Sequence, residues 1–347
     1  MGIAALVALV GFSRSFEHEW LRMYESSGTD IAVVQKTFLN TSVDESAGAK
    51  LRTLPVVAQA SPMILDLMDI TPEINALVYG WKADSYEFDS LTFKSGGRFR
   101  DGKPEVILGD LLAENLNKKV GDTLTIQGSV FTVTGIYHGN SAMETGALIM
   151  PLDELQQVAS LQGKVNAYHV RLRPVPAGTS SVEYLQRSQA EIEAALPGLR
   201  AVPAAQRASN NQLVVMAHAA AWGTSSIALL IGIFGIANTM AMSVFERTRE
   251  IGILRALGWK RRRIILLIQM EAAALGFAGG VIGIAAGWAA LRTLSTLPQT
   301  ASIVSPAFPL PLLLEALGIA VLAGLIAGAI PAWRGARLSP VEALRHD

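Results

Sequence analysis

Three long apolar stretches in the last third of the chain constrain its fold more than any other feature. They cover residues 220–245, 264–291 and 312–333 and are rich in Leu, Ile, Ala and Gly. A helix needs roughly 20 mostly apolar residues to cross a hydrocarbon core of about 30 Å, and each stretch is long enough. One such stretch could be a buried helix of a soluble protein, but three in succession predict a membrane α-helical bundle.

The start of the chain is also apolar, over a shorter distance. Residues 1–12 carry no charge, no basic segment precedes them and no clear small-residue cleavage site follows. We therefore expect residues 1–15 to form a partial first transmembrane helix, truncated relative to the other three. A signal peptide is the alternative.

The segment before the apolar stretches has the composition of an ordinary soluble domain. The whole chain is only 17% charged, against about 25% in soluble proteins, and the shortfall is concentrated after residue 217. Residues 16–217 are predicted to form an α+β domain, inserted between the first helix and the other three. Its clearest signal is a hairpin over residues 123–136 with its turn at Gly128 and Ser129, whereas residues 43–54 are expected to be a helix.

The distribution of basic residues predicts the orientation. Residues 246–263, between the first two long stretches, hold seven basic and two acidic side chains, whereas residues 293–311 hold no charged side chain. Since basic loops stay on the cytoplasmic side, this loop and the C-terminus are expected in the cytoplasm. The α+β domain is then extracytoplasmic.

Polar and small residues within the spans provide two further predictions. Glu271 lies about two turns into the second span, where a carboxylate is a functional candidate, although it could equally pair with Arg263 or lie at the headgroup level. Small residues at four-residue spacing predict helix contact faces, although Gly and Ala are common in membrane helices generally. The candidates are Gly279, Gly283, Gly287, Ala320, Gly324 and Gly328.

No catalytic constellation is recognisable in the sequence. Residues 97–103 match the glycine and lysine spacing of a phosphate-binding loop, but Pro104 occupies the position of the magnesium-ligating hydroxyl, so a turn is expected. The five histidines lack metal-ligand spacing and are expected on the solvated surface, and there is no cysteine. Zero net charge gives no indication of a nucleic-acid partner. We expect neither catalytic residues nor a metal or cofactor on this chain, which disfavours a membrane-anchored enzyme.

Three segments carry a family resemblance. Residues 245–258 (FERTREIGILRALG) resemble the signature of the FtsX-like permease family, the membrane subunits of ATP-binding-cassette (ABC) systems that include macrolide exporters, lipoprotein-releasing complexes and cell-division permeases. Residues 331–345 resemble the ending of that family, and residues 109–135 are similar to the MacB-type extracytoplasmic core domain. The resemblance implies one helix, a large external domain, and a permease domain over residues 218–347.

The resemblance also implies a function. The chain would be the transmembrane permease subunit of an ABC-type export system in the bacterial cytoplasmic membrane, transmitting motion from a separate ATPase, which binds ATP and Mg, to the external domain. A second permease subunit, identical or different, and a periplasmic adaptor or substrate protein are implied partners. The rival function is a non-transporting transmitter that regulates an envelope enzyme such as a cell-wall hydrolase. The substrate stays open.

The basic loop is the expected point of ATPase coupling. Ile251, Leu254 and Leu257 recur at helical spacing, which predicts a short helix with its apolar stripe on the bundle or in a groove of the ATPase. A surface helix that binds anionic headgroups through residues 260–263 is the alternative, and the resemblance favours coupling. The implied coupling residues are Glu246, Arg247, Arg249, Glu250, Ile251, Leu254, Arg255 and Gly258.

Overall fold

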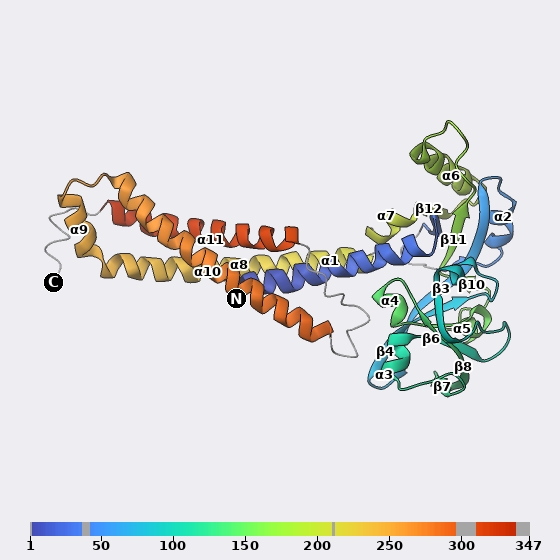
Figure 1. The fold of residues 1–347 in the computed structure, drawn as a ribbon. Helices are drawn as coiled ribbons and strands as arrows, with labels where there is room; N and C mark the ends of the chain where they lie inside the picture. The colour runs from blue at the N-terminus through green and yellow to red at the C-terminus, as the bar shows by residue number, and fades with distance from the viewer. Residues whose placement is uncertain (1, 37–41, 210–211, 296–309, 338–347) are drawn as a thin grey trace. The chain divides into compact units, whose positions relative to one another are not determined.

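The computed structural model describes residues 2–36, 42–209, 212–295 and 310–337, which divide into two compact units (Figure 1). The helical unit consists of Met1–Arg14, Met216–Thr293 and Pro306–Asp347, and the α/β unit of Ser15–Val215 and Leu294–Ser305. The α/β unit is therefore inserted between helices of the helical unit.

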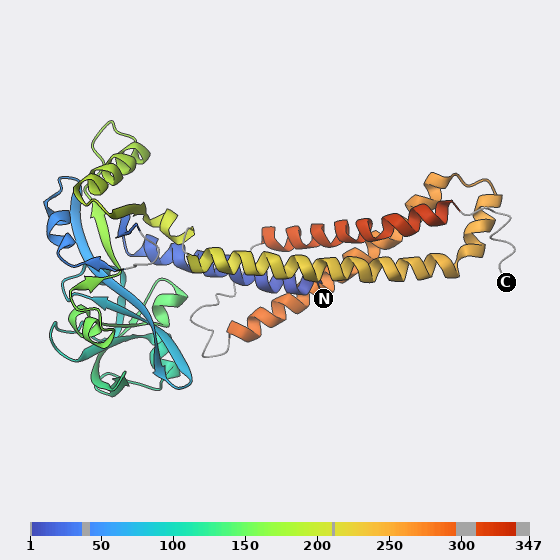
Figure 2. The ribbon, with the colours of Figure 1, turned by 180° about the vertical axis from the view of Figure 1, so that it is seen from behind.

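The helical unit contains the three apolar helices expected from the sequence. They are α8 (Gln212–Glu246), α10 (Arg261–Ser295) and α11 (Leu310–Ala336), and each is long and apolar enough to cross a membrane. The short helix α9 (Thr248–Ala256) lies between α8 and α10, at one end of both in Figures 1 and 2. Helix α1 (Gly2–Ser26) is not among the spanning candidates, so a membrane span at residues 1–15 stays a prediction.

The α/β unit is built on one mixed sheet of ten strands. The strand order is β12-β1-β11-β3-β4-β9-β6-β8-β5, and β7 pairs with β8. The pairs β4–β9 and β6–β8 are parallel, and the other pairs of the sheet are antiparallel. The strands are β1 (Ile31–Gln35), β3 (Val57–Thr71), β4 (Ile74–Trp81), β5 (Thr92–Gly96), β6 (Glu105–Gly109), β7 (Thr123–Ile126), β8 (Ser129–His138), β9 (Leu148–Pro151), β11 (Ala167–Leu172) and β12 (Leu199–Pro203).

Helices and a second small sheet complete this unit. Strands β2 (Val43–Asp44) and β10 (Lys164–Val165) pair with each other, and β2 occupies the start of the segment that was expected to be helical throughout. The helices are α2 (Ala47–Thr53), η1 (Tyr86–Ser90), α3 (Asp110–Asn115), α4 (Ala142–Thr145), α5 (Leu152–Val158), α6 (Ser181–Ala195) and α7 (Ala204–Ser209).

Alternation along the strands places an apolar core on each side of the sheet. In β4, Ala76 and Val78 belong to the core that α2, α3, α5 and α6 cover, whereas Tyr79 and Trp81 belong to a second, aromatic core. Residues of α1 from Trp20 to Tyr24 pack into the aromatic core. The half of α1 that belongs to the α/β unit is therefore part of its folded core.

The predicted hairpin is present, with its turn one residue earlier than expected. Gln127 has φ +48° and Gly128 has φ +84°, so both turn residues are in the left-handed region. A two-residue type I′ turn requires positive φ at both positions, which fits the twist of β7 and β8. Residues 97–104 connect β5 to β6, and no helix follows them, as expected of a turn and not of a phosphate-binding loop.

Candidate functional site

The candidate site is the connection from α8 to α10, which contains α9. Arg247 interrupts the helical path between α8 and α9, with φ −95° and ψ +18°, so α9 is a separate helix. Gly258 has φ +91°, a conformation that glycine adopts at little cost, and it ends α9 before α10 begins. The local sequence therefore sets a nine-residue helix between two bends.

One face of α9 packs on the helical bundle. Ile251 is buried in a cluster with Met240 of α8, Ile268 of α10 and Ala332 of α11, and Leu254 packs against the same cluster. Ile251 and Leu254 of the predicted apolar stripe thus lie on the bundle, which was one of the two alternatives.

The opposite face of α9 is exposed and mixed in character. Arg249, Ile253 and Leu257 follow one another at four-residue spacing, and the exposed fractions of Ile253 and Leu257 are 44% and 75%. Glu250 and the neighbouring Glu246 are exposed as well. Sequence reasoning did not single out Ile253 and grouped Leu257 with the buried stripe. The signal that could have identified this face is the four-residue spacing of Arg249, Ile253 and Leu257.

Two arginines of the loop are engaged within the helical unit. The Nη1 atom of Arg247 donates to both carboxylate oxygens of Glu271 on α10, at 3.2 and 3.3 Å. Arg255 donates through Nη1 to the carbonyl oxygen of Trp259 at 3.0 Å. Glu271 therefore pairs with Arg247 and not with Arg263, because the bend after α8 brings Arg247 beside the first turns of α10.

Small residues allow α10 and α11 to approach closely. A Cβ atom at Gly276 would lie 2.6 Å from the carbonyl oxygen of Ala320, and one at Gly324 would lie 2.5 Å from that of Ala272. Gly328 likewise faces the Cβ of Ala272. The three positions singled out on α11 therefore face α10.

On α10 the contact positions differ in part from those expected. Gly283 and Gly287 face Ile3 and Val7 of α1. Gly279 makes no such contact within the described part of the chain, since no atom of another element lies within 4 Å of the place of its Cβ. A strict four-residue repeat drifts around a helix of 3.6 residues per turn, so the buried face of α10 contains Gly276 and Gly280 instead.

An ion pair joins α1 to α11 in the same unit. Arg14 donates through Nη2 to Oε2 of Glu315 at 2.8 Å. Ile3, Leu6, Val7 and Val10 of α1 form a cluster with residues of α11. Glu315 on α11 therefore has an ion-pair partner within the helical unit.

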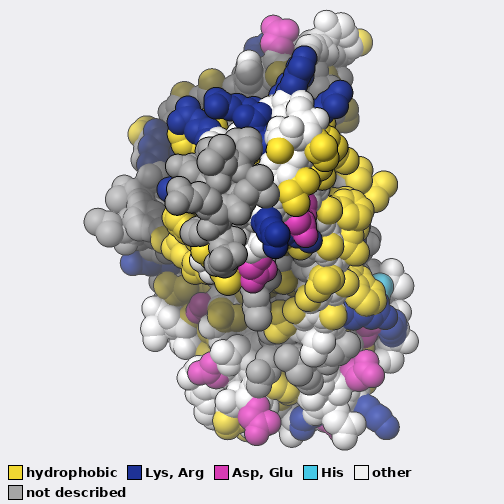
Figure 3. Space-filling model, turned by 90° about the vertical axis from the view of Figure 1, so that its left-hand side faces the viewer, with side chains coloured by type: hydrophobic (Ala, Val, Ile, Leu, Met, Phe, Trp, Pro, Cys, Tyr) yellow, Lys and Arg dark blue, Asp and Glu magenta, His cyan; other side chains and the backbone are white. Residues whose placement is uncertain are grey.

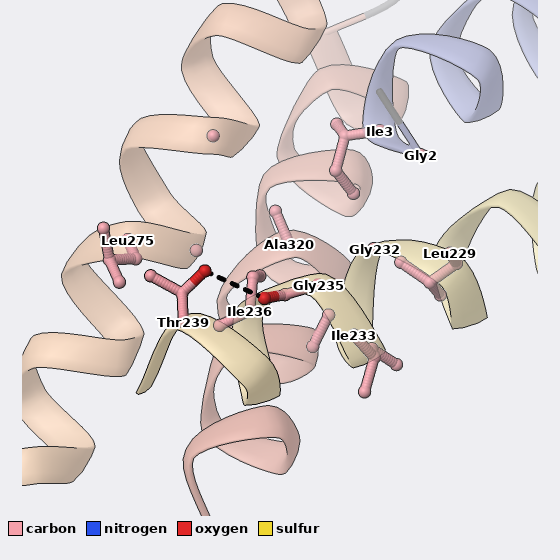
Figure 4. A pocket seen from close by; sticks show the side chains of 13 residues that line it. Gly2, Ile3, Leu229, Gly232, Ile233, Gly235, Ile236, Thr239, Leu275 and Ala320 are labelled. Carbon is pink, nitrogen blue, oxygen red and sulfur yellow. Dashed lines mark hydrogen bonds between the residues drawn. The ribbon is translucent and has the colours of Figure 1, made fainter. Parts of the chain in front are cut away.

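A cavity of about 380 Å³ lies among α1, α8, α10 and α11 (Figure 4). Its lining is apolar apart from Thr239, whose hydroxyl donates to the carbonyl oxygen of Gly235 at 3.0 Å. Gly279, which has no packing neighbour, lines this cavity. No charged side chain lines it, so it offers no group for acid, base or metal chemistry.

The α/β unit buries several ionisable groups. His169 lies 3.4 Å from Glu87, measured between Nδ1 and Oε1, and both side chains are buried, so the prediction of solvated histidines is wrong for His169. Glu19 and Glu144 are also buried. Among the described residues no three His, Cys, Asp or Glu side chains are placed to hold a metal ion.

Burial raises the pKa of Glu144 to about 7, and the nearby Glu19 charge adds to this. A bond of 2.7 Å from the backbone N–H of Asn140 to Oε2 of Glu144 opposes the shift without cancelling it. Since this pKa exceeds that of an unfolded glutamate, the folded protein binds an extra proton between pH 4.5 and 7. Stability should therefore fall as the pH rises across this window.

We expect Glu144→Gln to remove that decline, because glutamine stays neutral. The gain well above pH 7 should be roughly 3 kcal/mol, because a shift of one pKa unit corresponds to about 1.4 kcal/mol. The free energy of unfolding of the α/β unit, measured by chemical denaturation of the whole chain at pH 5 and at pH 8, tests this gain. Asp69→Asn, at an exposed carboxylate, is the control and should leave the slope with pH unchanged. An unchanged slope in Glu144→Gln would contradict the prediction.

Two protein families match this chain, and together they cover most of it. The FtsX-like permease C-terminal family matches residues 222–340, a range that contains α9 and the three long helices from residue 222 onward. The MacB-like periplasmic core domain matches residues 1–195.

Similar curated proteins are transport components. An uncharacterized ABC transporter permease of Methanocaldococcus jannaschii is 30% identical over 66% of this chain and 58% of its own length. The macrolide export ATP-binding/permease protein MacB of Nitrobacter winogradskyi is 26% identical over 99% of this chain and 56% of its own. The pyoverdine export ATP-binding/permease protein PvdT of Pseudomonas putida is 26% identical over 100% and 56%. The chain thus spans little more than half the length of these relatives.

Proposed function

Because this chain belongs to the MacB-type FtsX-like permease family, we propose that it is the transmembrane subunit of an ABC-type export system. In this proposal an ATPase, which binds ATP and Mg, docks on α9. The permease transmits the resulting motion to its extracytoplasmic domain. A second permease subunit, identical or different, completes the assembly in the cytoplasmic membrane, with α9 and the C-terminus in the cytoplasm.

The two-sided character of α9 is the observation that carries the proposal. A transmitting element needs one face fixed to the part that moves and another face free for the partner. Ile251 fixes α9 to α8, α10 and α11, whereas Arg249, Ile253 and Leu257 are exposed. An exposed surface with apolar residues beside an arginine is typical of the core of a protein interface.

Contacts within the helical unit support a path for force beyond α9. The Arg247–Glu271 pair joins the bend before α9 to α10. Helix α10 in turn packs closely on α11 through Gly276 and on α1 through Gly283. Helix α1 is unbroken from Gly2 to Ser26, and its second half belongs to the core of the α/β unit. A displacement of α9 would therefore reach α1 through packed, small-residue contacts.

The proposal predicts that replacing Arg249, Glu250 and Arg255 together by alanine abolishes permease-stimulated ATP hydrolysis. Arg249 and Glu250 are exposed for a partner, and Arg255 holds the end of α9 through Trp259. Stimulated hydrolysis of the purified complex should fall at least tenfold, while membrane insertion is retained. The matched control removes an exposed pair of opposite charges from α6, Glu183→Ala with Arg187→Ala.

Three outcomes would count against the proposal. Full stimulation in the triple variant would exclude α9 as the coupling element. An equal loss in the α6 control would show a general effect of charge removal. If a deletion strain failed in cell-wall cleavage and lost no export of any compound, the regulatory function would replace export.

A further inference from the structure

A second charged feature of the same loop is not used by the coupling proposal. Lys260, Arg261, Arg262 and Arg263 are consecutive and all exposed. In contrast to Arg247, which pairs with Glu271, they form no ion pair within the described part of the chain. In Figure 3, which faces this end of the helical unit, Lys and Arg side chains gather on the surface beside apolar ones. Four neighbouring cations repel one another, so their exposure favours an external anion.

The helical register divides this run between two faces of α10. Arg261 is three and seven residues before Ile264 and Ile268, which are buried in the bundle. Arg262 is four and eight residues before Leu266 and Met270, which are exposed. The arginines at 262 and 263 therefore lie above the exposed apolar face of α10, and Arg261 lies above its buried face.

The exposed face of α10 passes directly from cations to apolar side chains. The side chains of Leu266, Leu267 and Met270 are exposed. From Arg262 to Met270 the helix rises about 12 Å, at 1.5 Å per residue. Helix α10 is long and apolar enough to span a membrane, and a change from cations to apolar side chains over two turns is the pattern expected where headgroups give way to acyl chains.

We propose that Arg262 and Arg263, with Leu266 and Met270 below them, form a binding surface for the headgroup and acyl chain of an anionic phospholipid. The two arginines complement the negative charge of the lipid phosphate. The apolar side chains below them complement the acyl chain, which enters the bilayer at that depth. A soluble acidic protein would complement the arginines but not the apolar residues one and two turns further along. The inference holds whether or not the chain takes part in export.

The test compares binding of two lipids with identical acyl chains, phosphatidylglycerol and phosphatidylcholine, to the purified full chain by native mass spectrometry. A cation that lies against the bound headgroup contributes about fivefold to the preference for an anionic lipid, so Arg262→Gln with Arg263→Gln should lower the preference roughly 25-fold. The matched control, Lys260→Gln with Arg261→Gln, removes the same charge away from the exposed face of α10. It should lower the preference for phosphatidylglycerol less than threefold. Met270→Gln should weaken binding of both lipids.

The outcomes separate this surface from its alternatives. A preference that falls equally in the two double variants would show a non-specific effect of charge and overturn the proposal. So would a preference that is unchanged in Arg262→Gln with Arg263→Gln. If Arg262→Gln with Arg263→Gln instead weakened binding of the ATPase and left lipid binding intact, these arginines would belong to the protein interface, and the proposal would be overturned. Equal melting temperatures of the variants and the unaltered chain verify that folding is not the cause.

Discussion

Replacement of Ile251 by aspartate is expected to release α9 from the helical bundle. The side chain of Ile251 is buried beside Met240, Ile268 and Ala332. Loss of a buried isoleucine costs about 2–5 kcal/mol, and burying an unpaired carboxylate costs several kcal/mol more unless it moves into water. A helix of nine residues does not hold its structure alone, so α9 should unfold when its packing is lost.

Hydrogen exchange of the amides of α9 measures this effect directly. Exchange should accelerate by about a thousandfold, the factor that corresponds to about 4 kcal/mol. Permease-stimulated ATP hydrolysis should disappear with it. The control is Ile253→Asp, which places the same charge two residues away on the exposed face. Its exchange should stay near that of the unaltered chain, although binding of an ATPase should weaken. Retained protection in Ile251→Asp would contradict the packing described here.

Gly276→Val is expected to separate α10 from α11. Even a Cβ atom at this position would lie 2.6 Å from the carbonyl oxygen of Ala320, and that atom belongs to the backbone. The clash cannot be relieved by a side-chain rotation, so the helices must move apart. Overpacking costs about 1–3 kcal/mol at a tight site, and valine adds two methyl groups to the clashing atom. We expect a loss of roughly 3 kcal/mol, seen as a lower midpoint of unfolding in detergent.

The same helix contains the matched control, Gly279→Val. It changes helix propensity and hydrophobicity in the same way, but no atom lies within 4 Å of the Cβ position. Its midpoint should stay close to that of the unaltered chain. Equal destabilisation in the two variants would mean that the effect comes from helix propensity and not from the contact with α11.

The three long helices were predictable because a membrane span is a property of length and composition. The stretches at residues 220–245 and 264–291 correspond to α8 and α10, which each extend further in the structure. The longest strand, β3, was missed. It contains Pro62, and its buried and exposed residues do not alternate regularly, because β11 and β4 flank different parts of it. Its pairing partners decide its conformation, and those lie far away in the sequence.

For the candidate site, the sequence predicted the element better than its surface. The stripe of Ile251 and Leu254 predicted a short amphipathic helix, and α9 is present. Which of its apolar residues would be exposed could not be deduced, because periodicity places Leu257 near the stripe, and only the end of α9 at Gly258 leaves it uncovered. Glu271 was recognised as unusual, but its partner depends on the bend at Arg247.

The sequence by itself determined that the chain contains three membrane-length helices and a basic connection between the first two of them, and it predicted an inserted α+β domain. These features depend on hydrophobicity, charge and local spacing, which act on neighbouring residues. Only the tertiary structure decided that α9 turns Ile251 toward the bundle and Arg249 with Ile253 away from it, and that Gly276 rather than Gly279 contacts α11. These outcomes depend on which surfaces of distant segments cover one another, and a local pattern contains no information on that.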